Sequence, residues 1–398
     1  MRYILKQCGL LIACSILLTS CGIYKDALLE KRGETEDGYT IFEAEDAEVR
    51  LPKAPKEQIV TLESIAEKIE TDEATAPVEQ EIPTEKKIVL SAVGDVTLCS
   101  YEEQGYSGTF DEAYDINGGD YFFSNVKEFF SDDDITVINL EGNLTDSEER
   151  NPGRDYYLRG RQEYASILPK AGIDVVTLAN NHRNDFFEEG AKDTRDALDA
   201  VDMPYAYDNK VVLYEAGDVS VGVVAINCLG LKDYAKKLID SAASQFEERP
   251  DILVAALHWG IEREFYPDED QINIGHYCID QGFDLVIGCH PHVLQSIEEY
   301  EGRHIVYSMG NFCFGANRNP VDKDSIIYRE EFIFDDDKNL SETKGYVIPC
   351  SVSSVKERND FRPTPAEGED YNRIIERLNT YSNVYDTIID DNGIVTSR

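Results

Sequence analysis

Polar side chains that can bind a metal ion or transfer a proton follow apolar, strand-like runs at five places in this sequence. The most distinctive is His290-Pro291-His292, which comes just after the run Leu285–Ile287. In an extended segment, residues two apart lie on the same side, and neutral imidazole is a common ligand of transition metals. An isolated pair of this kind would equally suit a loop in which both rings hydrogen-bond to carbonyls. The other four places therefore decide between a metal site and such a loop. The full set is Asp95, Glu141, Asn181 with His182, His258, and His290 with His292.

These side chains need a fold that gathers the ends of separate strands. Predicted strands alternate with predicted helices, which is typical of an α/β fold. In open α/β sheets the ligand site lies at the carboxyl ends of the strands, so we expect the five places to meet there. One helix is marked by apolar or small residues at steps of three and four, at Phe187, Ala191, Thr194, Leu198 and Val201. The predicted strands cover 88–93, 135–140, 173–178, 219–226, 252–257 and 285–287, and the predicted helices cover 162–171, 187–201 and 270–281.

The chemistry of this set is that of a metal-dependent hydrolase. Carboxylate and amide oxygens with imidazole nitrogens suit Mn, Fe, Zn or Mg, often as two ions about 3.5–4 Å apart that share a carboxylate and promote phosphoryl transfer. His182 is placed to protonate a leaving group or to orient the substrate. Asp185 would either orient the His182 ring or cap the following helix. The sequence has no G-x-S-x-G, Walker or HExxH motif, and we expect structural roles for His276 and His304.

The composition limits the partners. The chain has 398 residues, with 38 Lys and Arg against 78 Asp and Glu, a formal net charge of -40 and a sequence pI near 4.4. Such a charge argues against nucleic-acid binding and against docking on anionic lipid through a basic patch. An anionic substrate would therefore have to be attracted locally, for instance by bound cations.

The first residues predict export and lipidation. A short basic start precedes an apolar run from Cys8 to Leu18, which is too short to span a bilayer comfortably. Leu18-Thr19-Ser20-Cys21 then has the form of a lipobox. We expect residues 1–20 to be a lipoprotein signal peptide and Cys21 to carry the lipid, on the extracytoplasmic face of the bacterial cell membrane. The alternative is an ordinary signal peptide or anchor with a chance cysteine.

The remaining organisation is a tether, one large domain and a tail. Residues 21–86 are acidic and poor in aromatic residues, so we expect a disordered acidic tether. A globular domain is predicted over 87–385 and a C-terminal tail over 386–398. Six cysteines remain after Cys21, and an exported chain allows either disulfides or buried thiols for them. They are Cys99, Cys228, Cys278, Cys289, Cys313 and Cys350.

The strand-end motifs together resemble the capsule synthesis protein family, the CapA and PgsA group of poly-γ-glutamate biosynthesis. The resemblance covers roughly residues 88–314 and weakens toward residue 385. It implies a variant of the calcineurin-like metallophosphoesterases, a four-layer αββα sandwich of two sheets flanked by helices. The matching motifs are Gly94-Asp95, Asn139-Leu140-Glu141-Gly142, Leu178-Ala179-Asn180-Asn181-His182 with Asp185, His258-Trp259-Gly260, Gly288-Cys289-His290-Pro291-His292-Val293 and Tyr307-Ser308-Met309-Gly310-Asn311-Phe312.

The resemblance also implies roles for individual residues. Glu141 would bridge two metal ions, and His182 would contact a scissile phosphate. Thr97 stands where the wider superfamily has a histidine, which would weaken or alter one metal site. Ser100 stands where the family commonly has an arginine. If that arginine holds an anion, Arg159 or Arg183 would be its substitute, and the alternative for each is a surface arginine. The implied metal ligands are Asp95, Glu141, Asn181, His258, His290 and His292.

Two functions follow from the resemblance. The first is a lipid-anchored hydrolase that uses one or two divalent transition-metal ions on a phosphoester, or on an amide of an anionic polymer such as poly-γ-glutamate or a related envelope polymer. The alternative is a non-catalytic subunit that uses the same fold to bind or assemble the polymer with membrane synthase subunits. Neither function involves nucleic acid.

The lipobox yields the first prediction. Replacing Cys21 with serine should abolish metabolic labelling with palmitate and release the chain from the membrane fraction, because serine offers no thiol for acylation. The measurement is labelling and fractionation of the full chain beside a Cys14→Ser control, since Cys14 lies inside the predicted signal peptide. Equal labelling of the wild type and Cys21→Ser would show that Cys21 is not the lipid attachment site.

Overall fold

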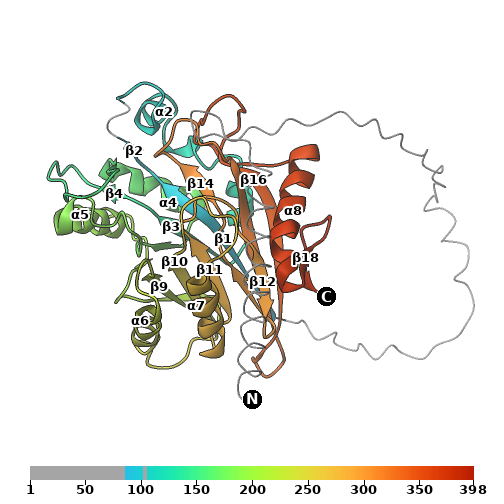
Figure 1. Cartoon of the computed structure of the whole chain (residues 1–398). Coiled ribbons are helices and arrows are strands. Elements are labelled where there is room, and N and C mark those ends of the chain that lie inside the picture. The colour runs from blue at the N-terminus through green and yellow to red at the C-terminus, as the bar shows by residue number, and fades with distance from the viewer. Residues whose placement is uncertain (1–85, 102–104) are drawn as a thin grey trace, which may run out of the picture. The chain divides into compact units, whose positions relative to one another are not determined.

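A computed structural model describes residues 86–101 and 105–398 (Figure 1). The predicted signal peptide, Cys21 and the predicted tether before residue 86 lie outside the described residues. Within the described part, no helix has both the length and the apolar character that crossing a membrane requires.

The first sheet has eight strands and is built around β1 (Lys86–Thr97). Along one edge β1 pairs in parallel with β3, and β6 and β7 continue in the same direction. Along the other edge β1 pairs antiparallel with β15, which β16 and β17 follow, and the last residues of β1 pair in parallel with β14. These strands are β3 (Ile135–Leu140), β6 (Val175–Thr177), β7 (Tyr205–Ala206), β14 (Asn311–Phe314), β15 (Asp324–Phe334), β16 (Leu340–Ser351) and β17 (Thr364–Pro365).

The second sheet has six strands in the order β12-β13-β11-β10-β9-β8. Its middle strands β9, β10, β11 and β13 are parallel, and antiparallel strands form both edges. A smaller sheet, β2-β5-β4, follows the ends of β1 and β3 in sequence. The bounds are β8 (Val212–Ala216), β9 (Val219–Asn227), β10 (Ile252–His258), β11 (Leu285–Cys289), β12 (Ile297–Tyr300), β13 (Arg303–Val306), β2 (Ser100–Tyr101), β4 (Asn143–Leu144) and β5 (Leu158–Gly160).

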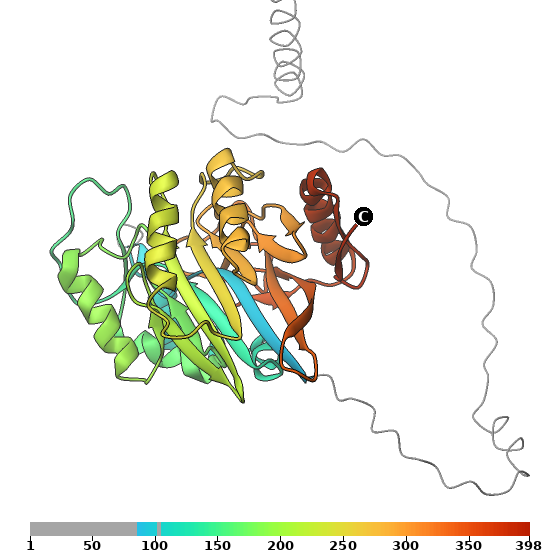
Figure 2. The same cartoon turned by 90° about the horizontal axis from the view of Figure 1, so that it is seen from below.

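The helices cover the outer faces of the two large sheets. In Figure 2, α6 and α7 run along the six-stranded sheet, and α8 supports its edge, where the Ser382 hydroxyl accepts a hydrogen bond from the Ile297 amide at 2.9 Å. The α-helices are α2 (Phe110–Asn117), α3 (Lys127–Ser131), α4 (Ile167–Ala171), α5 (Phe187–Asp199), α6 (Asp233–Ala243), α7 (Glu269–Asp280) and α8 (Gly368–Ser382), and the 3-10 turns are Gly119–Tyr121, Gln162–Ser166 and Asn383–Tyr385.

The strands are continuously apolar because both of their faces are buried. In β10, Val254 belongs to the core between the two sheets, whereas its neighbours Leu253 and Ala255 belong to the core under α6 and α7. A third core lies between the eight-stranded sheet and the helices of residues 110–200. This two-sided burial is typical of parallel strands, and each fully buried aliphatic side chain contributes about 1.5–3 kcal/mol.

The structure confirms the mixed α/β class and all six predicted strands. One side chain was predicted wrongly. Phe187, expected on the buried face of its helix, is 38% exposed, because the chain enters α5 there with φ 55 and turns the side chain outward. Ala191, Thr194 and Leu198 are buried as predicted.

The C-terminal residues and the cysteines both contribute to the interior. Residues assigned to the predicted tail form the hairpin of β18 (Thr387–Ile389) and β19 (Val395–Ser397), and Ile389 and Val395 join the core between the sheets. The domain boundaries themselves remain predictions. The six cysteines in the described residues are buried free thiols.

A close backbone contact joins the end of β1 to the segment before β14. The Asp95 amide donates to the Gly310 carbonyl at 2.9 Å, and a β-carbon on Gly94 would lie 2.0 Å from the same oxygen. Only glycine fits at position 94.

Gly94→Ala should therefore destabilise the protein by about 1–3 kcal/mol, because a backbone atom cannot move aside as a side chain can. The measurement is the midpoint of denaturant unfolding. Gly119→Ala is the matched control, since its new β-carbon would meet only side chains, the nearest being that of Ile167 at 3.1 Å. Equal unfolding midpoints for the two variants would contradict this account.

Candidate metal centre

The five strand ends meet where the carboxyl ends of both large sheets open. Asp95 lies near the end of β1 and Glu141 follows β3, both in the eight-stranded sheet, whereas His258 ends β10 and His290 follows β11 in the six-stranded sheet. Asn181 follows β6 after a short turn. Parallel register explains the convergence, since Asp95 pairs with Asn139, two residues before Glu141, and His258 pairs with Cys289, one residue before His290.

Glu141, His290 and His292 form a group that could hold a metal ion. One ligand atom from each lies within 4.8 Å of the others. Within the described residues, neither carboxylate oxygen of Glu141 has a hydrogen-bond partner, and Nδ1 of His290 has none. Buried polar atoms are nearly always satisfied, and a buried charge needs a partner. A divalent cation would satisfy all three atoms, so the residues fit such an ion.

Asp95 anchors this group through hydrogen bonds. Its Oδ1 accepts from the Asn139 amide at 2.7 Å, and its Oδ2 accepts from the His290 backbone N–H at 3.1 Å. Nδ1 of His292 lies 3.2 Å from the same Oδ2 and 2.9 Å from Oδ1 of Asn311. These acceptors favour a proton on Nδ1, which leaves Nε2 of a neutral His292 as the ligand atom.

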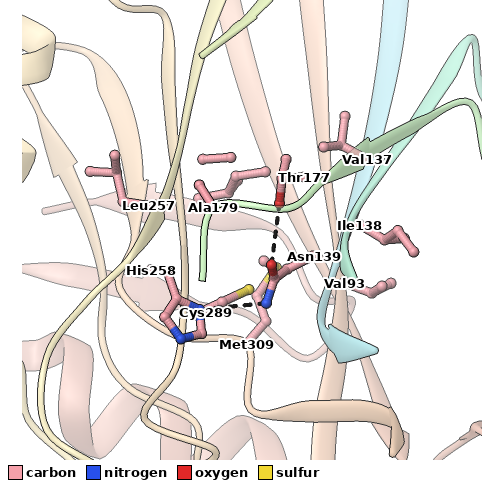
Figure 3. Close-up of a pocket in the computed structure, with 12 residues that line it drawn as sticks. Val93, Val137, Ile138, Asn139, Thr177, Ala179, Leu257, His258, Cys289 and Met309 are labelled. Atoms are coloured by element: carbon pink, nitrogen blue, oxygen red, sulfur yellow. Dashed lines mark hydrogen bonds between the residues drawn. The ribbon is translucent and has the colours of Figure 1, made fainter. Parts of the chain in front are cut away.

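His258 and Asn181 complete the ring of predicted ligands. Nε2 of His258 lies 2.7 Å from Oδ1 of Asn181 and 3.8 Å from Oε1 of Glu141, and the His258 and His290 rings are 4.7 Å apart. Figure 3 shows His258 beside Asn139, at a small cavity that is also lined by Thr177, Cys289 and Met309 among other residues. All six predicted ligands therefore belong to one connected network.

The pKa values in the site reflect burial and crowded charge. Burial raises the pKa of Glu141 to about 7, partly opposed by His292. Burial and the neighbouring His292 lower the pKa of His290 to about 4, and burial lowers that of His258 well below its usual value. His292 differs, because Glu141 and Asp95 outweigh burial and raise its pKa to about 10. His290 and His258 are thus neutral at pH 7, whereas His292 must lose a proton to bind a metal.

The His290-Pro291-His292 backbone is strained. His290 has φ 99 and His292 has φ 57, a region that residues other than glycine seldom adopt. Strain of this kind costs about 1–3 kcal/mol and clusters at functional sites. The positive φ angles accompany the convergence of both rings on Glu141, and the buried hydrogen bond from the His290 amide to Asp95 fixes the turn.

His182 and Asp185 form a second pair at the edge of the metal centre. Oδ2 of Asp185 lies 2.7 Å from Nδ1 of His182 and also accepts from the Leu158 amide at 3.0 Å. Asp185 is fully buried, and the N-cap of α5 is Phe186, so the carboxylate contacts the imidazole and does not cap the helix. Burial lowers the pKa of His182, but Asp185 and Glu141 outweigh it and raise the value overall.

Sequence reasoning gave no role to three asparagines that support this network. Asn139 and Asn311 hydrogen-bond to Asp95 and His292, as described above. Asn180 donates to Oδ1 of Asn139 at 3.2 Å and accepts from the His182 amide at 3.1 Å. All three lie inside the motifs quoted above. Their position within a few residues of the predicted ligands is the sequence feature that could have identified them as supporting residues.

The departures from the family pattern have structural consequences. The Thr97 hydroxyl accepts from the Ala316 amide at 3.1 Å, so Thr97 ties the end of β1 to the loop after β14. Arg183 pairs with Asp208 at 3.3 Å. Arg159 lies opposite Ser100 in the β2-β5 pair and donates to the Ser147 carbonyl at 2.9 Å.

These features define an α/β protein with a group that could hold a metal ion at the shared carboxyl ends of two sheets. The chain belongs to the bacterial capsule synthesis protein family PGA_cap, whose profile matches residues 89–316, more than half of its length.

Similar proteins come from several bacteria. The capsule biosynthesis protein CapA of Bacillus anthracis is 27% identical over 276 residues, which are 62% of this chain and 64% of that protein. The PGA biosynthesis protein CapA of Bacillus subtilis is 28% identical over 249 residues, 57% of this chain and 63% of that protein. A probable polyglutamine synthesis accessory protein of Mycobacterium tuberculosis is 28% identical over 208 residues, 45% of this chain and 55% of that protein. The chain thus matches less than two thirds of the length of these relatives.

Among solved structures, a hypothetical protein from Thermus thermophilus superposes with a TM-score of 0.41 and 15% identity, over 66% of this chain and 99% of that one. Purple acid phosphatase PPD1 from yellow lupin superposes with a TM-score of 0.32 and 10% identity, over 72% of this chain and 55% of that one.

The site predicts metal binding through its histidines. His290→Ala should lower the metal content of the purified full chain, because it removes one of three clustered ligands. Binding should also weaken on acidification, since His292 exchanges its proton for the metal. The measurement is elemental analysis after dialysis against Mn, Fe or Zn at two pH values.

His276→Ala is the matched control, because His276 pairs with Glu298 at 2.9 Å outside the ligand network. Equal metal content in the wild type and both variants would count against the assignment of His290.

Proposed function

We propose that this protein is a metal-dependent hydrolase of the phosphoesterase type that acts in the synthesis of a capsule or poly-γ-glutamate polymer. The observation that carries the proposal is the hydrogen-bonded pair of the part-buried His182 and the buried Asp185, beside the Glu141, His290 and His292 group. A protein that only held a polymer would not need an oriented imidazole next to a metal site. Family membership and the names of the relatives support the connection to the polymer.

The proposed site assigns distinct tasks to the side chains. Glu141, His290 and His292 would hold a divalent ion, and Asp95, Asn181 and His258 would complete the shell for one or two ions, with Mn, Fe or Zn suited to the donors. When bound, such an ion supplies an activated water and neutralises charge on the oxygens of the reacting group. The fold itself is proposed to be the four-layer αββα sandwich of the metallophosphoesterases, with its two sheets and outer helices.

His182 would serve the leaving group. Asp185 fixes the ring through Nδ1, which directs Nε2 away from Asp185 and makes it the atom available to the substrate. The charges of Glu141 and His292 both influence the pKa of His182, so the imidazole lies close to the metal-binding group. A protonated Nε2 can donate to an oxygen as negative charge develops there.

The proposed cellular setting is the outer face of the cytoplasmic membrane. Cys21 would anchor the chain through lipid, and the acidic tether would extend the domain toward the anionic polymer and the membrane synthase subunits that make it. The strongest competing role is a non-catalytic assembly subunit in the same place, with the same metal site.

His182→Ala separates the two roles. If the protein is a hydrolase, this change should reduce turnover of a phosphodiester by about 10²–10⁴-fold while metal content and melting temperature stay near the wild-type values. The measurement is steady-state hydrolysis of bis(4-nitrophenyl) phosphate and of γ-linked glutamate polymer by the full chain. His276→Ala should hydrolyse both as the wild type does.

Wild-type protein that is loaded with metal yet inert on both substrates would refute the hydrolase. Unchanged polymer output in cells carrying His182→Ala would then favour the assembly subunit. A loss of metal from His182→Ala would instead make His182 part of the ligand shell.

A further inference from the structure

Four arginines lie on the segment that runs from β4 to just past β5, beside the His182 turn. Arg150 and Arg154 lie in the loop, Arg159 lies in β5 and Arg161 follows it, in a segment that also carries Asp146, Glu148, Glu149 and Asp155. The loop is fastened to the His182 turn, because the Asn151 amide donates to the Asp185 carbonyl at 2.8 Å and the Leu158 amide donates to the Asp185 carboxylate. The arginines are therefore carried by a fixed segment.

Arg154 is the arginine of this loop that faces the His182–Asp185 pair. Its Nε lies 3.7 Å from Oδ1 of Asp185, an ion contact longer than a hydrogen bond, and its side chain is one-third exposed. Over residues 86–101 and 105–398, the structure gives its guanidinium no hydrogen bond. A guanidinium carries five N–H donors in a planar fork that matches carboxylate and phosphate groups.

The neighbouring arginines are directed elsewhere. Arg161 forms a bidentate pair with Asp115 at 2.6 and 2.8 Å. Arg159 donates to the Ser147 carbonyl and lies over the Phe186 ring, and Arg150 lies over Tyr157. Arg183, next to His182 in sequence, pairs with Asp208.

An anionic substrate needs such a cation at this place. Several carboxylates lie close enough to the site to raise the pKa values of its histidines, namely those of Asp95, Glu141, Asp185 and Glu262. They repel an anion and are weakly screened where they are buried. A bound metal would neutralise the carboxylates next to it. A polymer that carries charge on every repeat would also bring a second anionic group beside the reacting one, outside the metal shell.

We propose that Arg154 forms a subsite on the His182 side of the metal centre that binds a carboxylate or phosphate group of an anionic polymer. The inference rests on the proposed function, because it assigns the substrate class of that same site. The guanidinium would keep its ion contact with Asp185 through Nε and direct its terminal N–H groups to the ligand.

The test measures binding rather than turnover. Full-length, metal-loaded protein is titrated by calorimetry with a γ-linked glutamate oligomer and, separately, with a glycerol phosphate oligomer. Arg154→Gln should weaken the binding of the preferred probe by about 10-fold or more, as expected for charge-assisted hydrogen bonds. Arg161→Gln is the matched control and should bind as the wild type does, because Asp115 holds the Arg161 guanidinium. The probe that binds more tightly identifies the source of the anionic group.

Arg154→Lys distinguishes a ligand contact from a purely structural effect of the Arg154→Gln change. It keeps a positive charge beside Asp185 but loses the planar fork, so it should bind the oligomer more weakly than the wild type at full metal content. Binding by Arg154→Gln or Arg154→Lys within about twofold of the wild type would overturn the subsite and leave Arg154 as a neutraliser of Asp185. Failure of the wild type to bind either oligomer would overturn it as well.

The outcome is separable from that of the proposed hydrolysis. A wild type that binds an oligomer through Arg154 and hydrolyses nothing would refute the hydrolase and keep the subsite. If the wild type hydrolyses a small phosphodiester and Arg154→Gln binds the oligomer normally, the hydrolase is kept and the subsite is refuted.

Discussion

The buried carboxylate of Glu141 is the group on which the rest of the site depends. It lies between the ends of two sheets, and no hydrogen bond from the described residues reaches either oxygen. An ionised carboxylate in that position is very unfavourable unless a cation balances it. Burial raises the pKa of Glu141, which reflects the cost of a buried negative charge. His292 meets part of this demand for a cation, because it lowers the pKa of Glu141 while Glu141 raises that of His292. A divalent ion meets this demand more fully, because it can contact several donor atoms at once.

The surrounding polar groups hold the metal-binding side chains in fixed orientations. Asn139 donates to Oδ1 of Asp95, and Oδ1 of Asn311 lies 2.9 Å from Nδ1 of His292. Hydrogen bonds to the outer atoms of ligands fix their tautomer and direction, and they matter nearly as much as the ligands themselves. The positive φ angles of His290 and His292 indicate that the packed sheets hold a conformation the turn alone would not favour.

Much of the fold was predictable because burial on both faces leaves a strong signal. Six continuous apolar runs identified six strands, and the rule that ligands lie at the carboxyl ends of strands placed the site. The pattern could not show that two separate sheets contribute, because pairing between distant strands is not encoded in local periodicity. Nor does periodicity reveal the left-handed residue Phe187 at the first turn of its helix. Arg154 gave no signal either, because it reaches Asp185 only after an irregular loop folds back over the His182 turn through individual backbone hydrogen bonds.

The strongly negative net charge of the chain does not prevent an anionic ligand from binding, because only charges close to the site act strongly on that ligand. Charges on the exposed surface are screened beyond about 8 Å at physiological ionic strength, so most of the acidic surface acts weakly on a group already bound at the site. Nucleic-acid binding differs, because it requires many phosphate contacts spread over a wide basic surface. A single anionic repeat requires only the cations within one Debye length. A bound metal ion and the Arg154 guanidinium would supply positive charge on two sides of the same opening, while the acidic exterior would still repel polyanions that approach anywhere else.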